Sequence, residues 1–586
     1  MNYDLNQLSK TAPKTSTWAG LKKLIQLISH EKRTLLFALC AILINSTLNL
    51  LGPLIIGRTI DKYVQHKDFN GVIHNAILLL CMYMVALFTS YKQTTLMGGV
   101  GQRMLFTLRN SIFNKLQQLP VGFFNQNKAG DLISRVNNDT DKLNQFFSQS
   151  LMQFIGNIST MIGAGIFLLL IHPELGAATL APALVILFLT IVLSPWIKRK
   201  NAANLKSTGG LSGEIQESLN NFKVIIAFNR RDYFRKRFDT VNKENYQTAI
   251  GAGLANNVFV PVYGLFASIA QLIVLTFGIY LISIGHFSIG LLVSYLSYST
   301  NFYNPLRQLA ALWTNFQLAM AGWDRISQIL QLESDLPLIE EGITDGSAGL
   351  LEFRHVHFSY DDSKEILHNV CFKMEQGKTY ALVGPTGGGK TTTASLIARL
   401  YDASKGLVLL DGKDIRTYTA EERSLKIGFI LQEPFLFSGT VKDNILYGND
   451  LYKNHTNEQL EKVITDANLG SLLAIFESGL DTPVLSSGDS ISLGQKQLIA
   501  FMRAVLRNPQ ILILDEATAN IDTITEKLLS DILNKLPETT TRVIIAHRLN
   551  TIENADEIFF VNSGEVIRAG SLNDAMDLLL QGKRVS

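Results

Sequence analysis

Six long apolar stretches without a charged side chain occupy much of the first half of this 586-residue chain. They cover residues 34–57, 69–91, 147–171, 175–197, 258–282 and 289–306. About 20 consecutive apolar residues are enough to cross the roughly 30 Å hydrocarbon core of a bilayer. Buried helices of a soluble domain are the alternative, and six such lengths in succession argue strongly against it. The sequence therefore predicts an all-α domain of six transmembrane helices.

The charges between these stretches indicate the orientation. Lys and Arg crowd the segments before the first span, between the second and third, and between the fourth and fifth, whereas residues 172–174 and "SIGHFSIG" have neither. Positively charged loops stay on the cytoplasmic side, so both termini are predicted to be cytoplasmic. The N-terminus has no cleavable signal pattern. Together with the architecture, this favours the inner membrane of a bacterial cell.

The two long, positively charged connections are predicted to continue the spans as helices. Each has a break near its middle, at 119–139 and at 213–231. The breaks carry four phenylalanines: Phe123, Phe124, Phe222 and Phe228. Exposed aromatic side chains need a partner surface, so we expect the breaks to contact the domain that follows. Upstream, apolar residues at helical spacing beside Lys22 and Lys23 predict a helix at about 18–30 that lies along the membrane surface.

Bulk composition argues against other functions. A net charge of +3 is too small to indicate nucleic acid as a partner. The three cysteines, Cys40, Cys81 and Cys371, are far apart and predict neither a disulfide framework nor a zinc site. Ionisable residues inside a membrane are usually kept for function, and the spans contain no Asp, Glu, Lys or Arg. This argues against a proton-coupled secondary transporter.

A phosphate-binding pattern opens the second half. Gly384 to Thr391 fits G-x-x-x-x-G-K-[ST] between a predicted strand and a predicted helix. Its glycines allow backbone N–H groups to approach phosphates, Lys390 is placed to reach the β- and γ-phosphates, and the Thr391 hydroxyl to hold Mg²⁺. A chance glycine turn is the alternative. The predicted nucleotide-binding residues of this loop are Gly384, Pro385, Thr386, Gly387, Gly388, Gly389, Lys390, Thr391 and Thr392.

A pair of acids ends the apolar run in "NPQILILDEAT". Carboxylates at a strand end are costly unless something uses them, and the phosphate loop supplies a use. Asp515 is predicted to reach the Mg²⁺ shell. Glu516 is predicted to orient or deprotonate the attacking water; a surface or helix-capping acid is the alternative.

In this order, the motifs resemble those of an ATP-binding cassette (ABC) exporter with fused membrane and nucleotide-binding domains. The resemblance extends over nearly the whole chain. It rests on "HFSY", the phosphate loop, "GFILQEPFLFSGTVKDNI", "ISLGQKQ", "ILILDEAT", "NID" and "IIAHRLNTI". In the first half, "GDLISRVNND" is similar to the first coupling helix of such exporters.

The resemblance implies further roles. Tyr360 would stack on adenine, Gln432 would join the Mg²⁺ and water site to the coupling helices, and His547 would contact the γ-phosphate. Two cassettes of this family pair head to tail, so each signature loop completes the partner's ATP site. The residues implied to face the partner's ATP are Ser492, Gly494 and Gln495. The implied catalytic residues are Glu516, His547 and Gln432, and the implied Mg²⁺ ligands are Thr391, Gln432 and Asp515.

The chain also departs from the family pattern. Ile491 and Leu493 replace the first Leu and the first Gly of Leu-Ser-Gly-Gly-Gln, and Ser486 stands where a glutamate is usual. Residues 519–522 read Ala-Asn-Ile-Asp rather than Ser-Ala-Leu-Asp. The motifs that bind this chain's own ATP are intact, whereas the motifs that would contact the partner's ATP site are altered. In this combination the chain resembles one subunit of a heterodimeric exporter. Neutral drift in a homodimer is the alternative.

We therefore expect a multidomain chain: a transmembrane domain at 1–330, a linker at 331–349 and an α/β P-loop ATPase domain at 350–586. The expected function is ATP-driven export of a drug-like or lipid substrate by alternating access, as half of a heterodimer. The alternatives are a homodimeric lipid flippase or peptide exporter of the same family. The expected partners are a second half-transporter, the lipid bilayer and the substrate, without nucleic acid. Asn45, Asn49 and Asn157 are candidate contacts to substrate or to neighbouring helices.

Overall fold

The computed structural model of the chain describes residues 3–5, 31–334, 336–346, 349–360, 364–432, 434–485, 491–515, 523–545, 555–570 and 572–581. The chain divides into two compact units. The α/β unit combines Met1–Lys10, Gln117–Ala129 and Leu332–Ser586. The helical unit combines Thr11–Leu116 and Gly130–Gln331.

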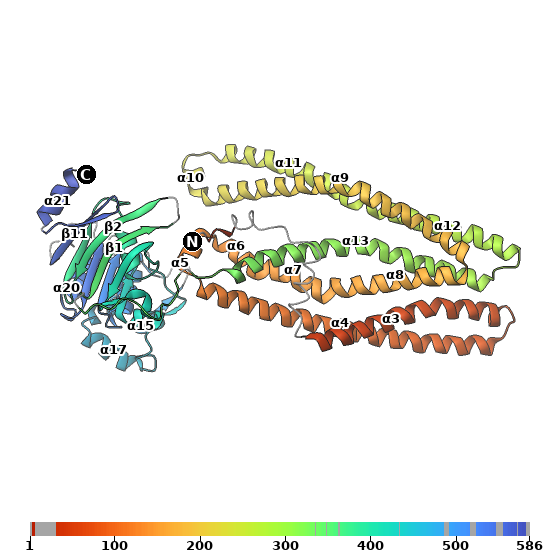
Figure 1. Cartoon of the computed structure of the whole chain (residues 1–586), viewed down its shortest axis with the longest axis horizontal. Coiled ribbons are helices and arrows are strands. Elements are labelled where there is room, and N and C mark those ends of the chain that lie inside the picture. Colours follow the sequence, from red (N-terminus) through yellow and green to blue (C-terminus); the bar gives the residue numbers. More distant parts are fainter. Residues whose placement is uncertain are drawn as a thin grey trace. The chain divides into compact units, whose positions relative to one another are not determined.

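The helical unit is built from long helices that run beside one another and are joined by short turns (Figure 1). Helices α4, α9 and α13 have 50, 48 and 43 residues, so at about 1.5 Å per residue they are longer than a bilayer core is thick. The predicted helical continuation of the spans is therefore confirmed. The elements are α3 (Lys32–Thr59), η2 (Ile60–Val64), α4 (Phe69–Gln118), α6 (Ala129–Ser134), η3 (Arg135–Asp139), α7 (Thr140–Gln145), η4 (Phe146–Ser150), α8 (Leu151–Ile171), α9 (Pro173–Asn220), α10 (Phe222–Ala227), α11 (Arg231–Asn257), α12 (Phe259–Ser283) and α13 (Ile289–Gln331).

Five helical stretches in the described part of the chain are long and apolar enough to cross a membrane. They are Lys32–Val64, Phe69–Gln118, Ala129–Ile171, Pro173–Asn220 and Arg231–Ser283. Each contains one of the first five predicted spans. The sixth predicted span opens α13, which is helical but is not among the five. Membrane crossing by this helix stays a prediction.

Tyrosine hydroxyls make the beginning of α13 less apolar and tie it to three neighbouring helices. Tyr298 donates to a backbone carbonyl of α3 at 2.7 Å, and Tyr303 to a carbonyl of α9 at 2.7 Å. Tyr295 donates to a carbonyl in the last turn of α8. All three side chains are buried. Burying a hydroxyl costs little once it is hydrogen-bonded, so these polar residues are compatible with a helix packed inside the bundle.

Two glycines bring the backbones of α3 and α13 together. A Cβ atom added to Gly290 would lie 2.0 Å from the carbonyl oxygen of Gly57. A Cβ atom added to Gly57 would lie 2.5 Å from the carbonyl oxygen of Gly290. Small residues allow close approach of helices in a membrane, and here both positions require glycine.

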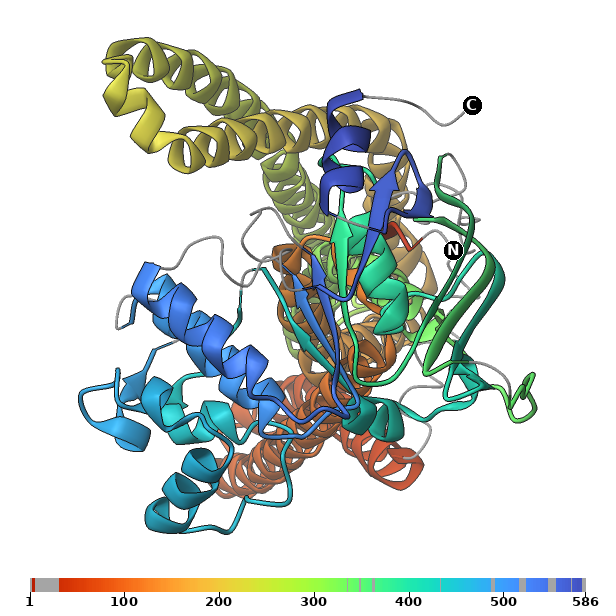
Figure 2. The same ribbon diagram turned by 90° about the vertical axis from the view of Figure 1, so that its left-hand side faces the viewer.

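A six-stranded sheet forms the centre of the α/β unit, in the order β12-β11-β3-β10-β9-β6. Neighbouring strands from β11 to β6 pair in parallel, and only β12 is antiparallel to its neighbour. A four-stranded antiparallel sheet, β2-β1-β4-β5, and a two-stranded sheet, β7-β8, complete the strands described. Figure 2 shows the central strands with helices on one side and the green strands of residues 351–374 on the other.

The strands are β1 (Leu351–Ser359), β2 (Glu365–Met374), β3 (Thr379–Val383), β4 (Lys405–Leu410), β5 (Lys413–Asp414), β6 (Ile427–Ile430), β7 (Gly439–Thr440), β8 (Pro483–Val484), β9 (Ile511–Asp515), β10 (Thr541–Ile545), β11 (Glu557–Asn562) and β12 (Glu565–Arg568). The helices are α5 (Val121–Gln126), α14 (Lys390–Ile397), α15 (Ala420–Lys426), α16 (Val441–Ile445), α17 (Asn457–Asp466), α18 (Gly470–Leu473), α19 (Leu493–Val505), α20 (Thr523–Asn534) and α21 (Leu572–Gln581).

Alternate residues of the central strands face two different cores. Leu512 and Leu514 of β9 join one hydrophobic cluster, whereas Ile511 and Ile513 join the other. All five residues of β3 and of β9 are buried. A parallel strand covered on both faces is apolar throughout, which explains the uninterrupted runs "YALV" and "ILIL" in the sequence.

Candidate nucleotide-binding site

The phosphate loop leaves the end of β3 and leads directly into α14. Gly384, Gly387 and Gly389 have φ angles of 149°, 79° and 115°, which favour glycine. A Cβ atom on Gly384 would lie 2.0 Å from the carbonyl oxygen of Val561, and one on Gly388 would lie 2.5 Å from the same oxygen. The loop therefore needs its glycines both for backbone conformation and for close packing against β11.

Lys390 is held across this loop. Its side chain is buried, and its ammonium donates to the carbonyl oxygens of Gly384 at 2.8 Å and Pro385 at 3.1 Å. Lys390 is also the first residue of α14, whose N-terminal N–H groups and dipole favour an anion. Backbone donors, a helix N-terminus and an ammonium group fit the phosphates of a nucleotide. Thr391 and Thr392 follow in the first turn of the same helix.

Tyr360 lies beside the phosphate loop. Its hydroxyl is 3.0 Å from Thr392 Oγ1, and its ring meets those of Phe358 and Tyr401 edge-on, with centroids 4.8 Å and 5.1 Å away. The side chain remains 41% exposed. It is thus held by two neighbouring rings and by Thr392 while part of its surface stays accessible, as stacking on a base would require.

The other described site residues come from the same edge of the central sheet. Ile545 of β10 pairs with Leu382 of β3 and with Asp515 of β9, while Ile430 of β6 pairs with Leu514. The carboxyl ends of these four parallel strands therefore lie side by side. Ligands of open α/β sheets bind at this edge.

The predicted nucleotide-site residues lie at or just after the carboxyl ends of these strands. The phosphate loop follows β3, Gln432 follows β6, and Asp515 is the last residue of β9, where it is 5% exposed. Glu516 comes directly after Asp515, and His547 follows β10 by two residues. Glu516, His547 and Ser486 lie outside the described residues, so their roles stay predictions.

The signature loop forms the beginning of α19. Ser492 Oγ accepts from the backbone N–H of Gln495 at 3.2 Å, and Gln495 Oε1 accepts from the backbone N–H of Ser492 at 2.9 Å. This is a capping box. The predicted partner-facing residues Ser492 and Gln495 thus have a structural role within their own chain. Ser492 is exposed and Gly494 half-buried, so the helix N-terminus keeps an open face.

Helix α5, inside the first predicted break, belongs to the α/β unit and packs against Tyr401. Asn125 donates to the hydroxyl of Tyr401 at 2.7 Å, and Gly122 lies against the same ring. Phe123, predicted to seek a partner surface, is fully buried, whereas Phe124 is 45% exposed. The described contact of the first break is therefore made by 121–126, upstream of "GDLISRVNND". The contact predicted for 213–231 stays a prediction.

The N-terminal residues Tyr3 and Leu5 are buried against the end of α5, a contact that no sequence feature predicted. Asn127 accepts from the N–H of Leu5 at 3.1 Å and donates to the carbonyl of Tyr3 at 2.9 Å. The Tyr3 ring meets Phe123 edge-on, and its hydroxyl donates to the carbonyl of Glu333 at 3.2 Å. Tyr3 and Leu5 occur in a polar N-terminal stretch without regularly spaced apolar residues. Hydrophobic periodicity therefore could not predict that these two side chains are buried.

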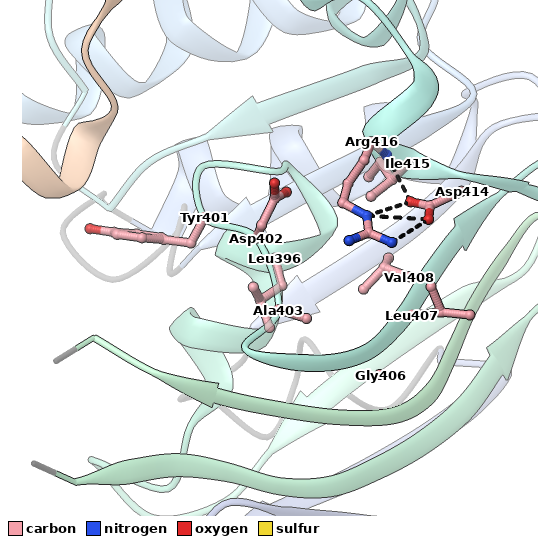
Figure 3. A pocket seen from close by; sticks show the side chains of 10 residues that line it. All are labelled: Leu396, Tyr401, Asp402, Ala403, Gly406, Leu407, Val408, Asp414, Ile415 and Arg416. Carbon is pink, nitrogen blue, oxygen red and sulfur yellow. Dashed lines mark hydrogen bonds and ion pairs between the residues drawn. The ribbon is translucent and has the colours of Figure 1, made fainter. Parts of the chain in front are cut away.

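Tyr401 also borders a small cavity of about 10 Å³ (Figure 3). On its other side Arg416 pairs with Asp414 at 2.7 Å. Burial raises the pKa of the Asp414 carboxyl, but its hydrogen bonds with Arg416 outweigh this and hold the pKa below its usual value. The cavity is about the size of a single water molecule. A nucleotide therefore cannot bind there, and the phosphate loop remains the candidate site.

The predicted membrane asparagines bind protein groups. Asn157 of α8 donates to Gln308 of α13 at 3.0 Å, and Asn49 donates to Asn45 one turn earlier on α3 at 3.1 Å. Asn157 thus links two helices, as one of the alternatives expected. Both pairs are exposed in the chain described.

Two families match this chain. The ABC transporter transmembrane region matches residues 35–306, and the ABC transporter family, which covers the ATPase, matches residues 367–519. The ABC transporter ATP-binding protein YfiC of Bacillus subtilis (strain 168) is 34% identical over 570 residues, which cover 96% of this chain and 93% of that protein. The chain belongs to the ABC transporter family.

Other comparisons agree with this family and with the fold. It is 31% identical to a fatty acid ABC transporter ATP-binding/permease protein of Mycobacterium bovis (strain ATCC BAA-935 / AF2122/97), over 86% of this chain and 80% of that protein. Its fold matches a bacterial Atm1-family ABC exporter with ATP bound at a TM-score of 0.77 and 23% identity, covering 94% of this chain and 96% of that one. The predicted fold class, a helical transmembrane domain joined to an α/β ATPase, is confirmed.

Membership of the family also settles the general activity. An ABC transporter with a fused ATPase binds ATP and couples its hydrolysis to transport. The match to the transmembrane region and the several apolar helices make this ABC transporter a multi-pass membrane protein.

Proposed function

We propose that this ABC transporter exports a hydrophobic or amphipathic molecule by alternating access, as one half of a heterodimer. The observation that carries the proposal is the convergence of the phosphate loop, Gln432 and Asp515 at one sheet edge, with Tyr360 beside the loop, in a chain that also has helices long and apolar enough to cross a membrane. A lipid is favoured because the spans are uncharged and one relative is named as a fatty acid transporter. A drug-like amphipath has the same physical character.

In the proposed site, the chain's own groups bind and orient the nucleotide. Tyr360 stacks on the base, the loop N–H groups and Lys390 bind the phosphates, and Thr391, Asp515 and Gln432 hold the metal and its water. Mg²⁺ held there would neutralise part of the phosphate charge. Glu516 accepts the proton of the attacking water, and His547 donates to the terminal phosphate. The partner's signature loop closes the site, as Ser492, Gly494 and Gln495 do for the partner.

The heterodimer rests on the unequal motifs. Leu493, where the family has glycine, is 41% exposed at the N-terminus of α19, so it adds a side chain beside the N–H groups proposed to bind the partner's phosphate. The phosphate loop and Glu516, in contrast, match the family pattern. One complete site would therefore use this chain's loop, and a slower site would use this chain's altered signature. A homodimeric lipid flippase or peptide exporter is the second candidate, which neutral variation at Ile491, Leu493 and Ser486 would allow.

Purification of this chain with and without candidate partners tests the proposal. We expect ATP hydrolysis stimulated by lipids or amphipathic drugs only in the mixed complex. Glu516→Gln should abolish hydrolysis while ATP stays bound, and Lys390→Ala should weaken ATP binding itself. A stable homodimer with full activity at two equivalent sites would refute the heterodimer and favour the second candidate. Normal hydrolysis by Glu516→Gln would refute its role as the main base.

The same proposal places both termini and both α/β units in the cytoplasm, on the inner membrane of a bacterial cell. Support comes from the Lys and Arg of the connections after the second and fourth spans.

A further inference from the structure

A network of charged side chains joins the beginning of the third spanning segment to the far end of α13. Arg325 of α13 donates to Asp131 at 2.5 Å and lies 3.0 Å from Asp139. Arg135 donates to Asp131 at 2.9 Å and to the backbone carbonyl of Arg325 at 2.7 Å. Lys142 donates to Asp139 at 2.8 Å. Each carboxylate thus meets two cations, and both arginines reach across between the two helices.

The centre of this network is removed from water. The side chains of Arg135 and Asp139 are only 2% and 1% exposed, whereas those of Arg325 and Lys142 are each 39% exposed. Removing two charges from water is expensive, and replacing such pairs by apolar residues is often neutral or stabilising. Stability alone therefore gives little reason for this arrangement. Fixing one helix at a defined register on another is a better-attested use of buried charges.

The local backbone supports that reading. Residues Arg135–Asp139 form a π-helical turn, η3, with the two buried charges as its first and last residues. Single π-helical turns are rare inside helices and are frequent at functional sites. Opposite η3, a Cβ atom on Gly322 of α13 would lie 3.0 Å from the carbonyl oxygen of Asp139. The irregular turn and the glycine together bring the two backbones close enough for the ion pairs.

The position of the network in the chain suggests its role. Helix α6 begins at Ala129, shortly after α5 ends at Gln126, and α5 contacts Tyr401 of the α/β unit. Helix α13 ends at Gln331 and leads into the same unit. Two of the four chain connections between the units, at 129/130 and 331/332, thus lie next to the helices that the network ties together.

We propose that Asp131, Arg135, Asp139 and Arg325 form a positioning joint, which makes α6–α7 and α13 move as one body when the ATPase changes state. The inference rests on the proposed exporter function, because it assigns the coupling between hydrolysis and substrate. All four residues belong to the helical unit, whereas the phosphate loop, Gln432 and Asp515 belong to the α/β unit. Loss of the joint should leave basal hydrolysis in place and weaken its response to substrate.

The test uses the full transporter with Arg325→Gln, Arg325→Lys and a matched control. The control is Asp141→Asn, which breaks the exposed pair between Asp141 and Arg109, also 3.0 Å long, on the neighbouring turn of α7. Basal ATP hydrolysis, its stimulation by substrate and thermal stability are measured for each. We expect Arg325→Gln to reduce stimulation about fivefold or more, the size of a typical coupling between sites, with basal hydrolysis within about twofold of wild type. Arg325→Lys, with one point charge, should restore part of the stimulation.

A second readout needs no substrate. Spin labels at Phe69 and Ile284, which are 73% and 45% exposed at the beginning of α4 and after α12, report the distance between two helix ends. Cys40, Cys81 and Cys371 are exposed and are replaced first. ATP with vanadate should change this distance in wild type and in Asp141→Asn, and much less in Arg325→Gln.

The outcomes separate the two proposals. If Arg325→Gln and Asp141→Asn show the same stimulation of hydrolysis by substrate and the same ATP-driven change in spin-label distance, the positioning joint is refuted. The proposed exporter function is not affected by that result. If basal hydrolysis, stimulated hydrolysis and thermal stability of Arg325→Gln all fall together, the network only stabilises the fold, and the positioning joint is refuted. If Arg325→Gln does not assemble, Arg325→Lys is judged by the same measures. A wild-type complex without an ATP-driven distance change would overturn the alternating-access function and the joint with it.

Discussion

At the scale of single residues, Ser492 and Gln495 show how one pair can serve both the fold and a proposed partner site. Their reciprocal hydrogen bonds cap α19, so loss of activity after substitution does not by itself report contact with the partner's ATP. The two roles differ in charge. A cap accepts a hydrogen bond from the helix, so an acidic side chain can replace serine there. A group that faces a phosphate cannot be replaced by an acid, because the two negative charges repel each other.

Ser492→Asp is therefore the informative substitution. Asp caps a helix about as well as Ser, so we expect stability to be preserved while its negative charge weakens ATP-dependent closure at the partner's site. Ser492→Ala should cost about 1 kcal/mol of stability through loss of the cap and affect hydrolysis less than Glu516→Gln does. Thermal unfolding and ATPase assays compare the variants. Full activity of Ser492→Asp would show that the serine serves only as a cap.

At the scale of elements, the N-terminal residues Tyr3 and Leu5 pack against the end of α5. Asn127 binds the backbone of Tyr3 and Leu5, and Tyr3 reaches the carbonyl of Glu333. The N-terminal residues thus bridge α5 to the segment that follows α13. Buried Tyr3 and Leu5 side chains contribute apolar area to the same contact.

Asn127→Ala should loosen this contact, because it leaves the backbone groups of Tyr3 and Leu5 without their partner at a cost of about 1–3 kcal/mol. We expect faster hydrogen exchange at residues 121–127, measured by mass spectrometry. Tyr3→Phe removes only the hydroxyl bond and should have a smaller effect. The control is Asn125→Ala, which leaves the N-terminal segment untouched but loses the bond to Tyr401. Unchanged exchange in Asn127→Ala would mean that the N-terminal residues do not hold α5.

The contact between α3 and α13 gives a second prediction for elements. Gly290→Ala would place its Cβ atom 2.0 Å from the Gly57 carbonyl oxygen, so the helices must separate. Overpacking of this kind typically costs about 1–3 kcal/mol. Gly264→Ala on α12 is the control, since a Cβ there meets nothing within 4 Å. We expect thermal stability in detergent to fall for Gly290→Ala alone. If Gly290→Ala and Gly264→Ala lower thermal stability by the same small amount, the close contact between α3 and α13 is contradicted.

At the scale of the whole molecule, orientation in the membrane follows from the distribution of charge rather than from any single contact. The turn between α12 and α13 contains no Lys or Arg, whereas the turn between α10 and α11 contains Arg230 and leads into Arg231. The positive-inside rule predicts that these two turns lie on opposite sides of the membrane.

Single cysteines at His286 and Arg230, which are both exposed, test this orientation in a chain without its native cysteines. In intact cells, a membrane-impermeant maleimide should label His286→Cys and not Arg230→Cys. Lysis should make Arg230→Cys reactive. Labelling of Arg230→Cys before lysis would reverse the proposed orientation.

The sequence by itself determined the features that depend on neighbouring residues. Uncharged lengths near 20 residues predicted the first five spans because a bilayer imposes that length on any helix. The spacing from Gly384 to Thr391 predicted the phosphate loop because its backbone conformation requires glycine at fixed positions. The order of motifs was sufficient to indicate the family and the class of activity.

Only the tertiary structure decided which distant residues meet. Asp515 and the phosphate loop share a sheet edge because β10 lies between their strands, an order that strand sequences alone do not specify. Tyr3 is buried against residues more than 120 positions away, and Arg135 reaches a carbonyl 190 positions away. Hydrophobic periodicity reports burial along one element, whereas these contacts depend on how several elements pack. The cap formed by Ser492 and Gln495 is different, because it joins residues three positions apart and its Ser-x-x-Gln spacing is visible in the sequence.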